Sequence, residues 1–258
     1  MILDSKPWAL VTGASSGLGI EFARQLAKRH HNLILVARSR RPMELLAEEL
    51  RATHDIDVLV EELDLAVAGS AGKLDEALRE RHIIPEVLVN NAAVGFHGPF
   101  LDQDPDSLRR MLQLDLITLT ELTHIFACRM AERGTGRILL VGSMAAYQPV
   151  PLFTVYAAAK AYVLSLGESL NVELAPDIMV TVLSPGVMET GFNEQSGYVM
   201  PSSLKPMLLA PEVVASIGLK ALFSGRSGVI AGRLNKLMAL ASRLMPRHFA
   251  AKQFFRQS

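Results

Sequence analysis

A glycine-rich segment follows the first apolar stretch of the chain and is itself followed at once by a helical pattern. It reads Thr12-Gly13-Ala14-Ser15-Ser16-Gly17-Leu18-Gly19. Glycine lets the backbone turn sharply after a strand and approach a ligand closely, and the free amides at a helix start attract an anion. The segment therefore predicts a strand–turn–helix unit whose turn binds a phosphate group.

Two other interpretations of this segment stay open. Residues 13–17 also fit GxSxG, the nucleophile turn of α/β-hydrolases, which likewise lies between a strand and a helix. Here, however, the motif belongs to the first strand–helix unit, and no HGGG-like segment precedes it. The other interpretation is a glycine-rich turn that binds nothing. Labelling of Ser15 by a fluorophosphonate would favour a serine hydrolase.

Short apolar runs alternate with longer amphipathic stretches, such as 20–29 and 42–51, along most of the chain. This alternation implies right-handed crossovers and a parallel sheet that is covered by helices on both faces. We expect a doubly wound, three-layer α/β fold with ligands at the carboxyl ends of the strands. The candidate strands are Ala9–Thr12, Leu33–Ala37, Val58–Glu61, Val87–Asn90, Ile138–Gly142, Val180–Leu183 and Val229–Ala231.

Length and composition favour one globular domain over residues 1–258. Half of the residues are hydrophobic and a fifth are charged, and we find no repeat or long linker. The net charge of zero gives no reason to expect nucleic-acid binding. The single cysteine, the absence of a signal-peptide pattern at the start and the lack of an 18-residue apolar run lead us to expect a cytoplasmic protein.

The end of the second strand indicates which dinucleotide the fold would bind. An NAD-binding protein carries an acidic residue there for the ribose, whereas this chain has Ala37 followed by Arg38, with Arg40 and Arg41 nearby. A carboxylate would repel a 2′-phosphate, and a guanidinium can bind it with two hydrogen bonds. The position favours NADP(H); a solvated basic loop is the alternative. Asp64-Leu65 and Asn90-Asn91-Ala92-Ala93 follow the third and fourth strands, where adenine and the nicotinamide ribose would lie.

Three polar residues form the candidate catalytic set. Ser143 follows the fifth strand, and Tyr156 and Lys160 are four residues apart, so they share one helix face. A tyrosine with its ordinary pKa near 10 is a poor acid/base at neutral pH, and a nearby ammonium lowers that pKa. Ser143 can hydrogen-bond a substrate carbonyl. The order of a glycine-rich first turn, a serine after the fifth strand and YxxxK thirteen residues later is far more specific than YxxxK alone.

From about Lys6 to Phe223 the chain resembles the short-chain dehydrogenase/reductase family. The resemblance rests on TGASSGLG, NNAA, the Ser143–Tyr156–Lys160 set and Pro185-Gly186 with Thr190. It implies a Rossmann-type fold with a seven-stranded parallel sheet, and hydride transfer between NADP(H) and a carbonyl or alcohol with Tyr156 as general acid/base. With the observations above, it predicts these cofactor contacts: Gly13, Ser15, Ser16, Gly17, Leu18, Gly19, Arg38, Asp64, Leu65, Asn91, Ala92, Ala93, Tyr156, Lys160, Pro185, Gly186 and Thr190.

The chain departs from the family pattern at two positions. Ala93 stands where the family has glycine, and Asp115, within an expected helix Arg109–His124, stands where it has an Asn that supports a water-mediated proton relay. If that relay uses the backbone carbonyl, the side chain matters little, so we expect an active enzyme with Asp115 in the catalytic set. A catalytically weak NADP(H)-binding regulatory protein is the alternative, and it would bind NADPH tightly without turnover. We expect no metal site.

The sequence gives weaker evidence for the residues that would contact a substrate than for those that would contact a cofactor. Residues 191–211 are rich in Gly, Ser, Pro and Met, and by the resemblance they form a lid over a small carbonyl or alcohol substrate. We expect His97 at the surface, although it and Phe100 are also candidates for the pocket. The other candidates suggest an apolar pocket; they are Phe96, Met188, Phe192 and Met200.

The last part of the chain is basic. After Glu212 it contains eight Lys or Arg residues and no Asp or Glu. Within 234–258 we predict an amphipathic C-terminal extension that docks on its own or a partner subunit, in a homo-oligomer; contact with an anionic membrane is a less favoured alternative. The apolar residues at helical spacing are Leu234, Leu237, Met238, Ala241, Leu244 and Met245.

Overall fold

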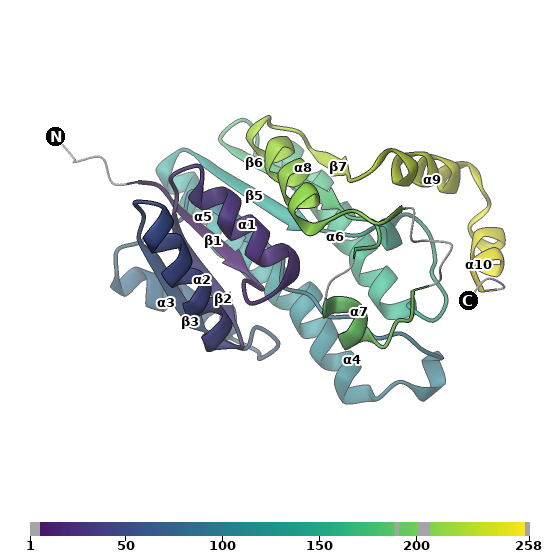
Figure 1. Cartoon of the computed structure of the whole chain (residues 1–258). Coiled ribbons are helices and arrows are strands. Elements are labelled where there is room, and N and C mark those ends of the chain that lie inside the picture. Colours follow the sequence, from purple (N-terminus) through teal and green to yellow (C-terminus); the bar gives the residue numbers. More distant parts are fainter. Residues whose placement is uncertain (1–5, 189–190, 201–206, 256–258) are drawn as a thin grey trace.

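The structure is a computed structural model, and it describes residues 6–188, 191–200 and 207–255. Thr190 and the 201–206 part of the expected lid lie outside the described residues. Figure 1 shows a central twisted sheet with helices on both faces, and the C-terminal helices at one end of the molecule.

The sheet has seven parallel strands in the order β3-β2-β1-β4-β5-β6-β7, which confirms the expected fold class. All seven predicted strands are present, with ends that differ by at most two residues. Strands β1 and β4 are neighbours at the centre of the sheet, and the chain adds strands on one side of β1 and then on the other side from β4 onward. Ligands of doubly wound folds bind at the carboxyl ends of the strands at such a switch point. The strands are β1 Trp8–Thr12, β2 Asn32–Ala37, β3 Val58–Glu62, β4 Val87–Asn90, β5 Gly136–Val141, β6 Ile178–Ser184 and β7 Gly228–Ile230.

Two apolar cores lie on the two faces of this sheet. One contains Phe22 of α1 and Leu219 of α8; the other contains Leu74 of α3 and Phe126 of α5. Because both faces are covered, every residue of β2 is buried, and its sequence is a continuous apolar run. The helices around the core are α1 Gly17–Ala27, α2 Arg40–Thr53, α3 Ser70–Glu80, α4 Pro105–Leu112, α5 Leu119–Arg133, α6 Thr154–Glu173 and α8 Pro211–Phe223.

Shorter segments and the C-terminal helices complete the described chain. The 3₁₀ turns η1 Phe100–Asp102 and η3 Met144–Tyr147 follow β4 and β5. Helix α7 Gly191–Ser196 lies within the expected lid, and α9 Arg233–Leu244 and α10 Arg247–Phe255 form the C-terminal extension. No helix of the described residues is long and apolar enough to cross a membrane.

The helix expected over 109–124 is not continuous. Between α4 and α5 the chain forms a π-helical segment, η2 Gln113–Thr118, with Asp115 fully buried inside it. A π segment widens the helix by one residue per turn and often occurs at functional sites. Apolar periodicity alone did not reveal this irregularity, because the flanking residues fit an α-helical pattern equally well.

The glycine-rich turn depends on a close approach between two backbone segments. Gly13 has a positive φ of 67°, which favours glycine. A Cβ atom on Gly19, at the start of α1, would lie 2.1 Å from the carbonyl oxygen of Gly13. Since that neighbour is backbone, it cannot move aside as a flexible side chain would. Gly19 therefore allows α1 to sit directly against the turn.

Substitution of Gly19 by alanine tests this close approach. Gly19→Ala should lower the free energy of unfolding by about 1–3 kcal/mol, as overpacking does elsewhere. Gly72→Ala in α3 is the matched control, because a Cβ there meets no atom within 4 Å. It should raise the free energy of unfolding by about 0.5–1 kcal/mol through helix propensity. Urea unfolding measures both, and equal stability of the two variants would contradict the packing argument.

Candidate active site

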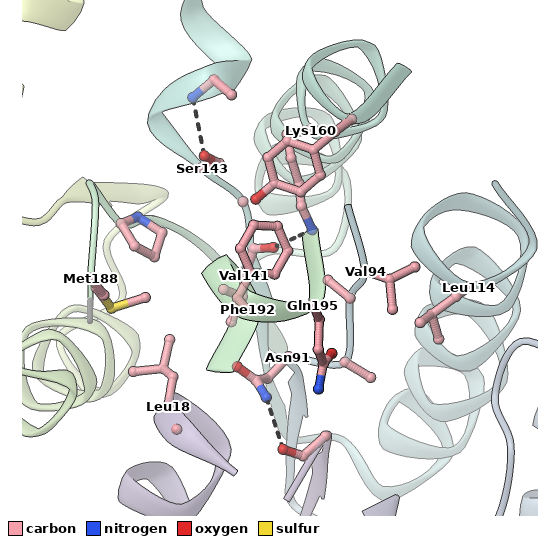
Figure 2. A pocket seen from close by; sticks show the side chains of 18 of the residues that line it. Leu18, Asn91, Val94, Leu114, Val141, Ser143, Lys160, Met188, Phe192 and Gln195 are labelled. Atoms are coloured by element: carbon pink, nitrogen blue, oxygen red, sulfur yellow. Dashed lines mark hydrogen bonds between the residues drawn. The ribbon is translucent and has the colours of Figure 1, made fainter. Parts of the chain in front are cut away.

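A cavity of about 610 Å³ lies at the carboxyl ends of the strands. Figure 2 shows Leu18 and Asn91 on one side of it, and Ser143 and Lys160 on another. Among the predicted residues, those that line it are Gly13, Ser15, Ser16, Gly17, Leu18, Arg38, Asp64, Leu65, Asn91, Ala92, Ala93, Ser143, Tyr156, Lys160, Pro185 and Gly186.

Two predicted contacts differ from the rest. Gly19 does not line the cavity, because its role is the close contact with Gly13 described above. Asp115 does not line it either; it lies behind Lys160. No histidine lines the cavity within the described residues, so Ser15 has no imidazole base there and the hydrolase interpretation loses support.

The glycine-rich turn is fixed to the end of β4 by hydrogen bonds. The Thr12 hydroxyl accepts from the backbone N–H of Asn91 and of Ala92, both at 2.9 Å, and the Asn91 amide donates to the Thr12 carbonyl at 2.9 Å. Asn90 faces away from the cavity and donates to the Thr123 hydroxyl at 2.9 Å. The first asparagine therefore anchors β4 to α5, and the second shapes the cavity.

These backbone features fit a dinucleotide. A Cβ atom on Gly13 would lie 2.8 Å from the Asn91 amide nitrogen and 3.0 Å from the Ala92 Cα, so the floor of the turn has space only for backbone. The turn leads into the start of α1, where free amides favour an anion. A pyrophosphate would thus be held by Gly13, Ser15, Ser16, Gly17 and Leu18.

At the end of β2 the side chains are arranged for a negative group. Ala37 is buried, and Arg38 is exposed and lines the cavity. Arg40 is held by Glu44 at 2.9 Å and Glu62 at 3.1 Å. Within the part of the chain that the structure describes, Arg38 forms no salt bridge or hydrogen bond, so its guanidinium is available to a ligand.

Asp64 has a partner that sequence reasoning missed. Arg110 of α4 approaches one of its carboxylate oxygens to 2.8 Å, and the backbone N–H of Ala66 donates to the other at 2.9 Å. Partial burial opposes ionisation of Asp64, but these two donors outweigh it and hold its pKa below the ordinary value. Arg110 itself lines the cavity. The sequence pattern did not indicate that Arg110 would pair with Asp64, because the two residues are 46 positions apart in the chain.

Tyr156 and Lys160 lie one turn apart on α6, and Ser143 lies at the end of β5 beside them. The Lys160 ammonium is 5.5 Å from the centre of the Tyr156 ring. Ser143 begins η3, and its hydroxyl accepts from the backbone N–H of Ala145 at 3.1 Å. A Cβ on Gly95 would lie 3.0 Å from the Tyr156 ring, so this glycine leaves room for the tyrosine. The structure brings together the three predicted residues.

Lys160 is buried and forms an ion pair with Asp115. Its ammonium lies 3.3 Å from one Asp115 carboxylate oxygen and donates to the Val141 carbonyl at 3.3 Å. The other Asp115 oxygen accepts from the backbone N–H of Val94 at 3.0 Å. Burial opposes the charge on Lys160, but Asp115 and Tyr156 outweigh it and raise the pKa of the ammonium. Burial also raises the pKa of Asp115, against the attraction of Lys160.

The net effect on Tyr156 is a raised pKa. Although part of its side chain opens into the cavity, the surrounding protein desolvates the phenol, and this is the largest contribution. Lys160 and the Ser143 hydroxyl lower the pKa, as the sequence analysis expects of the ammonium, and Asp115 raises it. The Asp115 side chain therefore raises the pKa of both Lys160 and Tyr156. This effect is separate from the proton relay through the backbone carbonyl that the family resemblance implies.

Aromatic and apolar side chains surround the end of the cavity near Tyr156. Phe96, Met188 and Phe192 line it as expected, whereas Met200 and Phe100 do not. His97 does not line the cavity either; it is half-buried, with its ring 5.0 Å from that of Phe153 and 5.3 Å from that of Tyr198, and partial burial lowers its pKa. Additional lining residues that sequence reasoning missed are Val150, Phe153, Tyr198 and Met207.

Helix α9 forms part of the cavity wall. Asn235, Met238 and Ser242 recur at three- and four-residue spacing and line the cavity. Asn235 is 3% exposed and donates to the Ala231 carbonyl at 2.6 Å. A Cβ on Gly186 would lie 2.2 Å from the Asn235 amide nitrogen, so Gly186 permits this close contact. The helix thus packs against its own chain through Asn235.

A doubly wound fold with a glycine-rich first turn and a cavity at the carboxyl edge defines a Rossmann-type dinucleotide-binding protein. The model of the family described as short chain dehydrogenase matches residues 7–198, and the chain belongs to the short-chain dehydrogenase/reductase family. Nicotinamide cofactors are typical of that family.

Three similar proteins illustrate the relationship. A short-chain dehydrogenase from Sphingobium yanoikuyae in complex with NADPH is 30% identical, with a TM-score of 0.81, covering 93% of this chain and 95% of that chain. A bulky-bulky ketone specific alcohol dehydrogenase from Comamonas testosteroni is 32% identical, with a TM-score of 0.77 and 93% coverage of both chains. Hydroxysteroid dehydrogenase-like protein 1 of Gallus gallus is 32% identical over 71% of this chain and 56% of its own length.

The chain spans about half of the length of the curated relatives it matches, from 33% of one to 59% of another.

Proposed function

We propose that the protein is an NADP(H)-dependent oxidoreductase that interconverts a carbonyl and an alcohol. The observation that carries the proposal is the placement of Ser143, Tyr156 and Lys160 together in a cavity whose other end fits a dinucleotide. Two similar proteins support it: one is in complex with NADPH, and the other is described as a ketone-specific alcohol dehydrogenase.

The residues of this chain would have distinct roles. A bound NADPH would supply the hydride for the carbonyl carbon. Ser143 would donate a hydrogen bond to the carbonyl oxygen, and Tyr156 would donate its phenolic proton to that oxygen as the alcohol forms. Lys160 would stabilise the resulting phenolate by its charge, and Asp115 would keep the ammonium protonated within the protein interior.

The substrate that fits best is an apolar ketone, aldehyde or alcohol. Aromatic rings meet at the substrate end, with Tyr156 and Phe192 centroids 5.3 Å apart and Phe153 and Tyr156 centroids 5.6 Å apart. A ketone with large apolar substituents would contact these rings while its oxygen faces Ser143 and Tyr156. A panel of carbonyl compounds, followed by the loss of NADPH absorbance, tests the proposal; no turnover of any compound would count against it.

A regulatory NADP(H)-binding protein is a second candidate, and the Asp115–Lys160 pair is the observation that favours it. A carboxylate so close to Lys160 offsets part of the charge that would stabilise the Tyr156 phenolate. Tight NADPH binding with no turnover across the panel would support this candidate. The intact Ser143, Tyr156 and Lys160 support the enzyme.

Removal of the Tyr156 hydroxyl should abolish most of the chemistry and leave binding intact. Tyr156→Phe keeps the ring but loses the transferable proton, so kcat should fall by about 10²–10⁴-fold or more. The NADPH dissociation constant, measured by fluorescence titration, should change little. Tyr162→Phe on the same helix is the control, since Tyr162 bonds Thr120 and lies outside the cavity. Near-normal turnover by Tyr156→Phe would mean that another group donates the proton.

Cofactor preference should depend on Arg38. A hydrogen bond to a charged group contributes about 1.5–3 kcal/mol, so NADPH should bind about ten- to hundredfold more tightly than NADH. The double variant Ala37→Asp, Arg38→Leu should reverse or erase the difference, because the aspartate would repel the 2′-phosphate and accept from a 2′-hydroxyl. Arg41→Leu, outside the cavity, is the control. Equal affinity of the unaltered protein for both dinucleotides would refute the assignment.

The Asp115 carboxylate should set the alkaline limit of the reduction. Reduction needs protonated Tyr156, so activity is lost as the pH rises through its pKa. Because Asp115 raises that pKa, Asp115→Asn should move the alkaline limb of the kcat profile to lower pH. Asp106→Asn on the surface of α4 is the control. Superimposable profiles would show that the Asp115 side chain has no part in the titration, and a large gain at every pH would favour the regulatory candidate.

A further inference from the structure

Helix α9 docks through one face and leaves a large apolar face exposed. The buried residues are Asn235 and Ala239, both 3% exposed. On the opposite side, Leu237 is 65% exposed and Leu240 is 59% exposed. The sequence pattern predicts that the leucines dock on this chain or on a partner subunit; within this chain they are exposed. We define the exposed face of α9 as Leu234, Leu237, Met238 and Leu240, each of which is at least 43% exposed.

Basic side chains border this face. Arg233 and Lys236 of α9 are exposed, and the following helix, α10, carries two more exposed basic residues, Arg247 and Lys252. No acidic residue follows Glu212, so nothing on either helix neutralises them. Phe249 of α10 adds another exposed ring. An apolar stripe beside lysine and arginine is the pattern of a helix that lies in the plane of an anionic membrane surface.

We propose that the exposed face of α9 binds the surface of an anionic phospholipid membrane. The leucines would enter the boundary between headgroups and acyl chains, and Arg233 and Lys236 would contact the phosphates and carboxylates. A second copy of the chain fits less well, because a two-fold contact through this face would oppose arginine and lysine on both sides. A helix of this kind lies in the interface and does not span the bilayer, so the membrane contact should be peripheral.

The exposed face also lies next to the cavity. Met238 belongs to it and lines the cavity, while Asn235 and Ser242 line the cavity from the docked side of the same helix. Val199, which follows the lining residue Tyr198, is 86% exposed. Figure 1 places α9 and α10 at one end of the molecule, away from β3 and α2. Membrane contact at this end would bring the cavity close to the lipid.

Vesicle sedimentation with the full chain tests the proposal. The protein should sediment with phosphatidylcholine vesicles that contain phosphatidylserine, bind much less to phosphatidylcholine alone, and be released by salt. Each basic residue near the surface contributes about a fivefold factor in partitioning, so Arg233→Gln with Lys236→Gln should weaken binding about 25-fold. Leu237→Glu with Leu240→Glu should abolish it.

Leu45→Glu on α2 is the matched control, because Leu45 is an equally exposed helical leucine far from α9. It should bind vesicles like the unaltered protein. Circular dichroism and sedimentation velocity should show that all variants keep the fold and oligomeric state. Failure of the unaltered protein to bind phosphatidylserine vesicles would overturn the proposal. So would dissociation of an oligomer by Leu237→Glu with Leu240→Glu, which would mean that a second copy covers the face.

Discussion

The charge on Lys160 is the constraint around which the site is arranged. An ammonium group taken out of water is costly unless it is paired and hydrogen-bonded, and Lys160 is only 1% exposed. Its partners come from separate parts of the fold: the Asp115 carboxylate from η2 and the Val141 carbonyl from β5. Loss of one partner of such a buried pair typically costs about 3–5 kcal/mol. The position of the π segment and the chemistry of Tyr156 are therefore linked through one side chain.

That linkage explains why Asp115 is more than a conservative replacement of asparagine. One of its oxygens fixes the backbone of Val94, next to Gly95, against which the Tyr156 ring lies. Its other oxygen faces the ammonium. An asparagine could provide the first contact but would carry no charge for the second. The same carboxylate that stabilises the Lys160 ammonium opposes ionisation of Tyr156. A change at residue 115 that makes the phenol more acidic would therefore remove the partner of the buried ammonium.

The parts of this molecule that follow from repeated local patterns could be predicted from the sequence. Apolar runs bounded by turn residues identified all seven strands, and the spacing of Tyr156 and Lys160 placed both in one cavity. The π turn could not be predicted, because its apolar positions also fit an α-helix. The leucines of α9 were expected to dock on this chain or on a partner subunit, and in this chain they are exposed, since periodicity identifies a leucine stripe but not what covers it. Asn235 of α9 packs against Gly186, and that contact joins residues far apart in the sequence.

The wall formed by α9 has a consequence for how proteins of this kind diversify. The family match ends at residue 198, whereas Asn235, Met238 and Ser242 lie beyond it and still line the cavity. The proposed reacting groups thus come from the part of the fold that matches the family, and part of the cavity wall comes from the C-terminal extension. Exchange or extension of that segment during evolution can change which molecules are admitted while the proposed proton donor and the charges beside it stay in place.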